Sequence, residues 1–317
     1  MNETLRRRFS RRLAVVPWAL AIALSLSAGA QANRLEVGPH QQLKMPSAAA
    51  SVARAGDTIV IQPGQYFDCA VWTANHLTIS GAGPGVVITD KTCEGKALFV
   101  VRGNDMTIRN ITFTRARVPD GNGAGIRLEG RNLTVENSRF VNDENGILAG
   151  DDAGSVVTIS NSEFDDNGRC ESACAHGIYV GHIALLRISG SKFYDTKMGH
   201  SVKSRALRTE LRNDTIEDGP AGTSSYLVDI SNGGSLVMQN NILEKGPNSS
   251  NHGAAIVIGG EGVTQPTAEL RISGNTFRND QSRRTIFVRN LTATPAVLTG
   301  NTLTGPVEPL SGDGSVH

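Results

Sequence analysis

The sequence predicts an all-β solenoid of about 8–10 coils, each built from three short strands. Eight copies of one eight-residue phrase recur at steps of 23 to 34 residues, from MTIRNITF at 106–113 to AVLTGNTL at 296–303. The fifth position of every copy is Asn or Gly, the residues that most readily adopt a left-handed backbone. A further short strand pattern, such as HGIYVG at 176–181, precedes seven of the copies. Each repeat therefore supplies two strands around a tight bend and one more strand before them.

The first 32 residues are predicted to be a signal peptide rather than part of the fold. Five arginines lie between positions 6 and 12, an apolar run follows over 13–26, and Ala-Gln-Ala precedes Asn33. This run is shorter than the ~20 residues that a spanning helix needs, and small residues suited to cleavage follow it. We expect a periplasmic or secreted protein, exported by the general or the twin-arginine route, with no membrane segment after cleavage.

The charge of the expected mature chain excludes a global attraction for nucleic acid. Removal of residues 1–32 takes away five arginines and one glutamate and lowers the formal net charge from +1 to −3. An anionic partner must therefore be held by a local group of cations. We expect a monomer.

The four cysteines are predicted to form two disulfides, because an even count in an exported chain favours pairing. The simplest pairs are Cys69–Cys93 and Cys170–Cys174. A zinc site is the alternative, but the cysteine spacings fit it poorly.

The repeats, together with the segment ARAGDTIVIQPGQYFD at 53–68, resemble the right-handed parallel β-helix of the pectin lyase-like superfamily. The resemblance covers about residues 53–305. It implies an N-terminal segment at 33–56 with a capping helix within Gln41–Ala55, and a β-helix domain at 57–305. Residues 306–317 are rich in Gly, Pro and Ser, so we expect a flexible tail there. The superfamily includes lyases, hydrolases, epimerases, esterases and adhesins, so the fold alone does not fix a reaction.

Stacking the coils on one inward residue of each first strand places polar side chains in columns. These inward residues are Ile126, Ile147, Ile178, Val202, Val228 and Ile256. The turn before the strand then stacks His176, His200 and Tyr226. The outward position after the inward residue stacks Tyr179, Lys203 and Asp229, with Arg205 beside them. Flanking coils supply mostly Ala, Leu, Val and Gly in these columns, and the polar patch spans roughly 10 Å.

This patch is the predicted functional site. The expected catalytic residues are Lys203, Arg205, His200, Tyr179 and Tyr226, and the expected substrate-binding residues are His176, Asp229, Asn145, Arg127 and His252. The plainer alternative is a solvated ladder of mixed charge, in which Lys203 and Asp229 simply pair.

Among the activities of that superfamily, we expect a polysaccharide lyase, a class that acts on uronic-acid polymers. Such an enzyme needs a cation to neutralise the C5 carboxylate, a base for the C5 proton and an acid for the leaving oxygen. Lys203 and Arg205 resemble the base and acid of some relatives. His200 as base with Tyr179 or Tyr226 as acid is an equally economical arrangement.

Three other functions remain open at this stage. A C5-epimerase would use the same groups, although the signature Asp-Pro-His-Asp is absent. AHGIYVG at 175–181 looks like a polygalacturonase segment, but Ala124 and Asn145 stand near positions where that family has aspartates. A non-catalytic module could hold the same acidic polysaccharide.

No cofactor is expected. Calcium is conceivable through acidic residues near the patch, and each is also an ordinary turn residue. These residues are Asp151, Asp152, Asp195 and Asp229.

Overall fold

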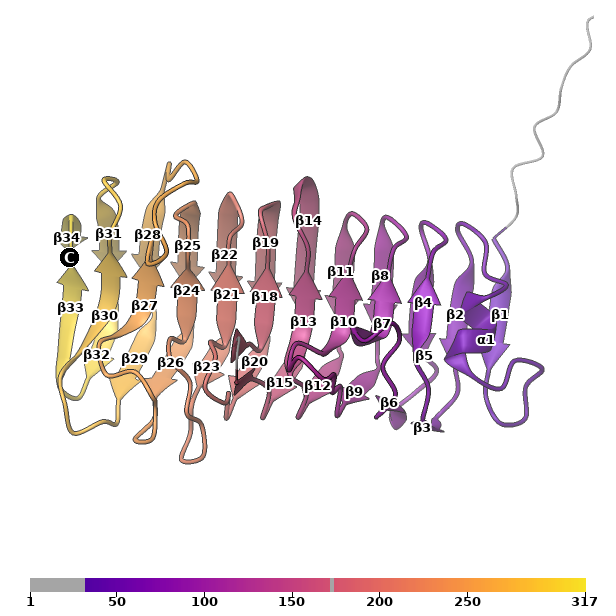
Figure 1. Cartoon of the computed structure of the whole chain (residues 1–317). Helices are drawn as coiled ribbons and strands as arrows, with labels where there is room; N and C mark the ends of the chain where they lie inside the picture. Colours follow the sequence, from indigo (N-terminus) through magenta and orange to yellow (C-terminus); the bar gives the residue numbers. More distant parts are fainter. Residues whose placement is uncertain (1–31, 172–173) are drawn as a thin grey trace, which may run out of the picture. The chain divides into compact units, whose positions relative to one another are not determined.

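The computed structural model describes residues 32–171 and 174–317, and the predicted signal peptide lies outside them except for Ala32. The described chain is a parallel β-solenoid with three sheets of 12, 10 and 10 strands (Figure 1). Ten complete coils contribute one strand to each sheet, and the strands Arg34–Val37 and Gly314–Val316 extend the first sheet at its two ends. Successive coils therefore lie side by side and hydrogen-bond in parallel. The predicted fold class is confirmed. The ten complete coils lie within the predicted range of about 8–10, and a partial coil is added at each end.

The strands fall into three sheets in chain order. The first sheet contains β1 (Arg34–Val37), β2 (Thr58–Ile61), β5 (Thr78–Gly81), β8 (Met106–Arg109), β11 (Leu133–Glu136), β14 (Asp152–Ser160), β19 (Ile183–Ser189), β22 (Arg208–Arg212), β25 (Ser235–Gln239), β28 (Leu270–Ser273), β31 (Ala296–Thr299) and β34 (Gly314–Val316). The second contains β3 (Gly64–Tyr66), β6 (Val86–Thr89), β9 (Thr112–Thr114), β12 (Arg139–Val141), β15 (Glu163–Asp165), β20 (Lys192–Tyr194), β23 (Thr215–Glu217), β26 (Ile242–Lys245), β29 (Thr276–Asn279) and β32 (Thr302–Thr304). The third contains β4 (Ala70–Trp72), β7 (Ala97–Val101), β10 (Ala124–Leu128), β13 (Asn145–Ala149), β18 (Ile178–Val180), β21 (Val202–Ser204), β24 (Val228–Ile230), β27 (Ala254–Ile258), β30 (Thr285–Asn290) and β33 (Val307–Ser311).

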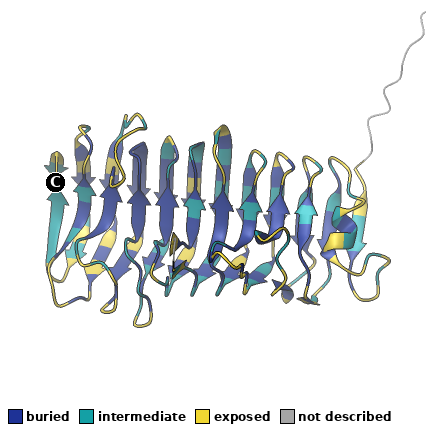
Figure 2. Cartoon of the chain, in the orientation of Figure 1, coloured by how far each residue is buried: buried dark blue, intermediate teal, exposed yellow. Residues whose placement is uncertain are grey.

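The core is a continuous cluster of apolar side chains inside the coils. Figure 2 shows the buried residues recurring on the strands along the solenoid. Phe113, Phe140, Phe164 and Phe193 stack on successive coils, with ring centroids 5.1, 4.7 and 4.6 Å apart. These separations follow the inter-coil spacing of about 4.8 Å. The predicted register is also confirmed, because Ile126, Ile147, Ile178, Val202, Val228 and Ile256 are direct partners on neighbouring strands.

The fifth position of the repeat makes the bend between the first and second sheets. Asn137 and Asn161 have φ angles of 48° and 49°, and Gly190 has 61°. A left-handed backbone costs little for Asn and Gly, which explains why only these residues occur there.

The position after this bend forms a buried polar ladder along the solenoid. Each side chain accepts a hydrogen bond from the main-chain N–H of the equivalent residue one coil earlier, so buried amide groups are satisfied. Asp214 Oδ1 accepts from Ser191 N at 2.8 Å, and Asn241 Oδ1 accepts from Asp214 N at 2.9 Å. The ladder members are Ser138, Ser162, Ser191, Asp214, Asn241, Asn275 and Asn301.

The two ends differ from expectation in extent. The N-terminal helix, α1 (Pro46–Ala50), is shorter than the predicted Gln41–Ala55, and its Ala49 is fully buried in the core. The prediction of a flexible tail at 306–317 is wrong, because β33 and β34 pair with β30 and β31. Parallel pairing to the previous coil needs only main-chain groups, so the Gly- and Pro-rich composition did not prevent it.

Both predicted disulfides, Cys69–Cys93 and Cys170–Cys174, are present. The second joins β16 (Arg169–Cys170) to β17 (Cys174–Ala175), a short antiparallel pair just before His176. In residues 32–171 and 174–317, no helix is long and apolar enough to cross a membrane.

Replacing Asp214 with Asn should remove a pH-dependent loss of stability. Burial raises the pKa of Asp214 from 3.8 to about 7, although main-chain N–H groups oppose the shift. Between about pH 4 and pH 7 the unfolded chain has therefore lost a proton that the folded chain keeps, and stability falls as pH rises. A shift of about three units corresponds to ~4 kcal/mol at most. Asp214→Asn should gain stability relative to wild type on going from pH 4 to pH 8, as measured by urea unfolding.

The matched control is Asp120→Asn, because Asp120 is an exposed aspartate that lies outside the ladder. If the Asp214→Asn and wild-type curves run parallel from pH 4 to pH 8, then Asp214 does not keep its proton in the folded ladder.

Candidate functional site

Three neighbouring strands bring the predicted outward column together. Tyr179 on β18 pairs with Lys203 on β21, which pairs with Asp229 on β24. Although these side chains leave the core, Lys203 and Asp229 are only 7% and 3% exposed. The pair of Lys203 and Asp229 that the plainer alternative predicted is present at 3.4 Å, but it is buried rather than solvated, so its charges depend on each other and on their other partners.

The two cations share their contacts with Tyr179 and with carboxylates. Arg205 Nε donates to the Tyr179 hydroxyl oxygen at 2.9 Å, and the Lys203 ammonium lies 5.7 Å from the centre of the Tyr179 ring. Lys203 Nζ lies 3.4 Å from Asp229 Oδ2, and it also donates to Glu261. Arg205 donates to Asn232 and to the second oxygen of Glu261.

The turns that precede these three strands place His176, His200 and Tyr226 in a second column, the turn column, whose rings stack beside the charged residues. His176 and His200 lie 4.8 Å apart between centroids, and His200 and Tyr226 lie 5.2 Å apart. His176 Nδ1 accepts from His200 N at 3.0 Å, and His200 Nδ1 accepts from Tyr226 N at 3.1 Å. Because each Nδ1 is an acceptor, the proton of each neutral ring is on Nε2. His200 Nε2 lies 3.4 Å from Asp229 Oδ2.

This hydrogen bonding gives His200 a supporting role. Burial lowers the pKa of His200 to about 3, and the charges of Lys203 and Lys245 add to the effect. The neutral ring has one lone pair, on Nδ1, and the Tyr226 amide already occupies it. His200 therefore has no free site for a substrate proton, and the geometry favours a role in holding Asp229 and the Tyr226 strand.

Asp229 is held beneath Lys203. Its Oδ2 accepts from Ser231 Oγ at 2.8 Å, and its buried Oδ1 has no hydrogen-bond partner among the described residues. Burial raises the pKa of Asp229, and the charge of Lys203 opposes the shift. Asp229 is thus a counter-charge that fixes the ammonium of Lys203 from the inner side.

The remaining predicted binding residues lie outside this cluster. Arg127 is on β10, two strands from Tyr179, and its Nε is buried without a partner among the described residues. Asn145 is fully buried and accepts the main-chain N–H of His176 at 2.8 Å, so it supports the turn column. His252 is exposed, and no hydrogen bond or ion pair of the described residues joins it to the cluster.

The sequence reasoning missed Glu261 as a member of the site. Glu261 lies in the coil with the longest step between repeats, 34 residues, and no residue of that insertion was among the predicted site residues. The signal that could have found it is an acidic residue flanked by glycines in an insertion next to two outward cations.

A second missed group is a buried lysine one coil further on. Lys245 is fully buried and donates to the main-chain oxygen of Ser225 and to Ser249 Oγ, which donates to Asp218 at 2.6 Å. Burial lowers the pKa of Lys245 to about 8. Its bond to Ser225 fixes the turn that presents Tyr226.

The acidic residues on the coils before the polygalacturonase-like segment at 175–181 bind groups outside the cluster. Asp143 accepts from Ala116 N at 2.7 Å and Glu144 accepts from Gly123 N at 2.7 Å, and both are 1% exposed. Asp151 contacts His182, and Asp152 pairs with Arg131. These four carboxylates therefore do not form a facing pair at the cluster. Among residues 32–171 and 174–317, no group of three His, Cys, Asp or Glu is gathered to hold a metal ion.

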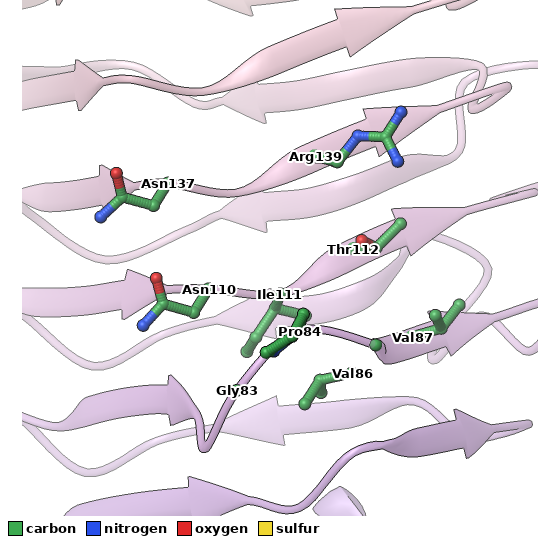
Figure 3. A pocket seen from close by; sticks show the side chains of 10 residues that line it. Gly83, Pro84, Val86, Val87, Asn110, Ile111, Thr112, Asn137 and Arg139 are labelled. Carbon is green, nitrogen blue, oxygen red and sulfur yellow. The ribbon is translucent and has the colours of Figure 1, made fainter.

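A surface hollow of about 670 Å³ lies away from the cluster, on β6, β9 and β12 (Figure 3). Pro84, Val86 and Ile111 line it, with Asn110 and Arg139 at its side. Its one charged side chain, Arg139, already pairs with Glu163 at 2.7 Å. We place the candidate site at Lys203 and Arg205 because the hollow brings together no groups for acid–base chemistry.

Comparisons with known proteins agree with the fold. The family model described as "Right handed beta helix region" matches residues 52–175 and 152–314. The crystal structure of an alginate lyase from Paenibacillus sp. str. FPU-7 is similar over 89% of this chain and 99% of that chain, with a TM-score of 0.65 and 18% identity. A PL6 family alginate lyase is similar over 86% of this chain but 40% of its own, with a TM-score of 0.55 and 17% identity. A search of curated proteins finds no match.

His200 should stay neutral across the pH range in which an ordinary histidine, with a pKa near 6.5, becomes charged. In the ¹⁵N-labelled protein, His200 should show a protonated Nε2 and an unprotonated Nδ1 from pH 8 to pH 5, because its folded-state pKa is about 3. Comparison with the His200→Gln variant assigns the signals. A midpoint near pH 6.5 for these signals would show that the ring is not held as described.

Proposed function

We propose that this chain, which belongs to the family described as right handed beta helix region, is a polysaccharide lyase that cleaves a uronic-acid-containing polymer by β-elimination. The observation that carries the proposal is the convergence of Lys203, Arg205 and Tyr179 on neighbouring strands, with a carboxylate bridging the two cations. The similarity to two alginate lyases supports the choice of an acidic polysaccharide.

The cations address the first difficulty of the reaction. Removal of the C5 proton places negative charge next to a carboxylate that already carries one, so the carboxylate must be neutralised. Lys203 and Arg205 both donate to a carboxylate in this structure, that of Glu261. A uronate carboxylate in the same place would receive two charge-assisted hydrogen bonds.

Tyr179 is the proposed proton-transfer group. As a phenolate it takes the C5 proton, the C5 electron pair forms the C4=C5 double bond, and the C4–O4 bond breaks. The phenol then returns this proton to O4, so one residue serves as base and acid when the C5 hydrogen and O4 lie on the same face of the ring. The Arg205 guanidinium donates to the phenolic oxygen and stabilises negative charge on it.

His200, Asp229 and Tyr226 are positioning residues in this proposal. Asp229 faces Lys203 at 3.4 Å, and His200 faces the same carboxylate oxygen at 3.4 Å. The ring stack of His176, His200 and Tyr226 keeps these groups in line over three coils. We further propose that the protein is exported to the periplasm or the medium, where the polymer is found and where the two disulfides are stable.

Tyr179→Phe should abolish most of the lyase activity, because it removes the transferring hydroxyl and keeps the ring. General acid–base catalysis contributes about 10²–10⁴-fold, so kcat should fall by that factor. Alginate, polygalacturonate and glycosaminoglycans are screened by absorbance at 235 nm, which reports the new C4=C5 double bond. Lys203→Ala should also lose activity, whereas Lys192→Ala, an exposed lysine on β20, should keep it.

Other outcomes of this screen oppose the proposal. New reducing ends without absorbance at 235 nm indicate a hydrolase, and retention on an acidic polymer without either signal indicates a binding protein. Full turnover by Tyr179→Phe or by Lys203→Ala would remove that residue from the mechanism.

A further inference from the structure

Glu261 reaches the cluster from a loop that other coils lack. The main chain anchors this loop, because Glu261 N donates to Ser231 O at 2.9 Å and Thr264 N donates to Asn232 O at 2.9 Å. Gly259 and Gly262 have φ angles of 82° and 95°, which let the chain turn on both sides of Glu261. The Glu261 Cα is thereby fixed above the two cations.

The Glu261 side chain bridges Lys203 and Arg205 and covers them. One carboxylate oxygen accepts from Lys203 Nζ and the other accepts from Arg205 Nη2. The Glu261 side chain is 44% exposed, whereas those of Lys203 and Arg205 are 9% and 18% exposed. A molecule that approaches the cations from solvent therefore meets the Glu261 carboxylate first.

The bridge leaves no unbalanced cation. Lys203 and Arg205 carry two positive charges, and Asp229 and Glu261 carry two negative charges. Burial raises the pKa of Glu261, but the hydrogen bonds from Lys203 and Arg205 outweigh this effect and lower it. The carboxylate is therefore ionised at neutral pH, and an incoming anion finds a neutral cluster.

We propose that the position of the Glu261 carboxylate is a subsite for the carboxylate of a sugar acid, and that Glu261 is an internal competitor that the ligand displaces. The choice of a uronate as ligand rests on the proposed function. The Glu261 side chain has room to leave, because it is 44% exposed to solvent.

The competitor also makes the subsite selective. A uronate carboxylate replaces both hydrogen bonds of Glu261, so the exchange conserves charge and bonding. A neutral sugar cannot replace them, and its binding would leave Arg205 without its carboxylate partner and Lys203 with Asp229 alone. Leaving buried charges unpaired is strongly unfavourable. Glu261 therefore excludes neutral polysaccharides at the cost of some affinity for acidic ones.

The test compares glucuronate with glucose, which lacks only the carboxylate, by NMR or calorimetric titration. Removing the competitor in Glu261→Ala should tighten glucuronate binding by at least about 10-fold relative to wild type, and Glu261→Gln should tighten it less because its amide remains. Glucose binding should not improve. Glu269→Gln is the control, because Glu269 ends the same loop but pairs with Arg208 and Arg271.

The site of binding is tested in the same experiment. Adding Lys203→Met to Glu261→Ala should abolish the gain for glucuronate. Unchanged or weaker glucuronate binding in both Glu261 variants, or a gain that survives Lys203→Met, would overturn the inference. A gain in binding without any product absorbing at 235 nm from any polymer would instead overturn the lyase proposal and leave the subsite standing.

Discussion

The rest of the structure depends on parallel, in-register hydrogen bonding between successive coils. Because one coil repeats on the next at about 4.8 Å, each position of the repeat becomes a column along the solenoid. The stacked rings of Phe140, Phe164 and Phe193 and the polar ladder through Asp214 are two such columns inside the coils. The column of Tyr179, Lys203 and Asp229 is a third, on the outer side of one sheet.

The sequence predicted this stacking of coils because the residues that indicate it are local and repeated. A left-handed residue at the fifth position and inward apolar residues recur in every copy, and a small polar residue follows the bend in every copy except the first, which has Ile111. An irregular residue in one copy therefore does not obscure the pattern of the others. Register then followed from aligning Ile178 with Val202 and Val228, as the strand pairing confirms. The tail at 306–317 was missed because its pairing uses the main chain and has little side-chain signal.

The composition of the cluster was less predictable, because two of its partners come from outside the repeat. Glu261 and Asn232 reach Arg205 from 56 and 27 residues away, one of them in an insertion with no counterpart in other coils. The hydrogen bonds of His200 also could not be predicted from the sequence, because a histidine in this turn can either accept from the next coil or face solvent. Because its Nδ1 accepts from Tyr226 N, His200 positions the neighbouring turn and is not free to act as a base.

Local energetics explain why charge is concentrated on these coils. A coil in a solenoid contacts only its neighbours. The unfavourable desolvation of Lys203 and Asp229 is therefore offset by ion pairs and hydrogen bonds within the same few coils. On either side the same column returns to Leu148 and Val257, which are 4% and 2% exposed. Those apolar neighbours exclude water from the ends of the cluster and strengthen every interaction within it. The same exclusion makes an unpaired cation there expensive, and a bridging carboxylate from the inserted loop, Glu261, is what satisfies both cations when no ligand is bound.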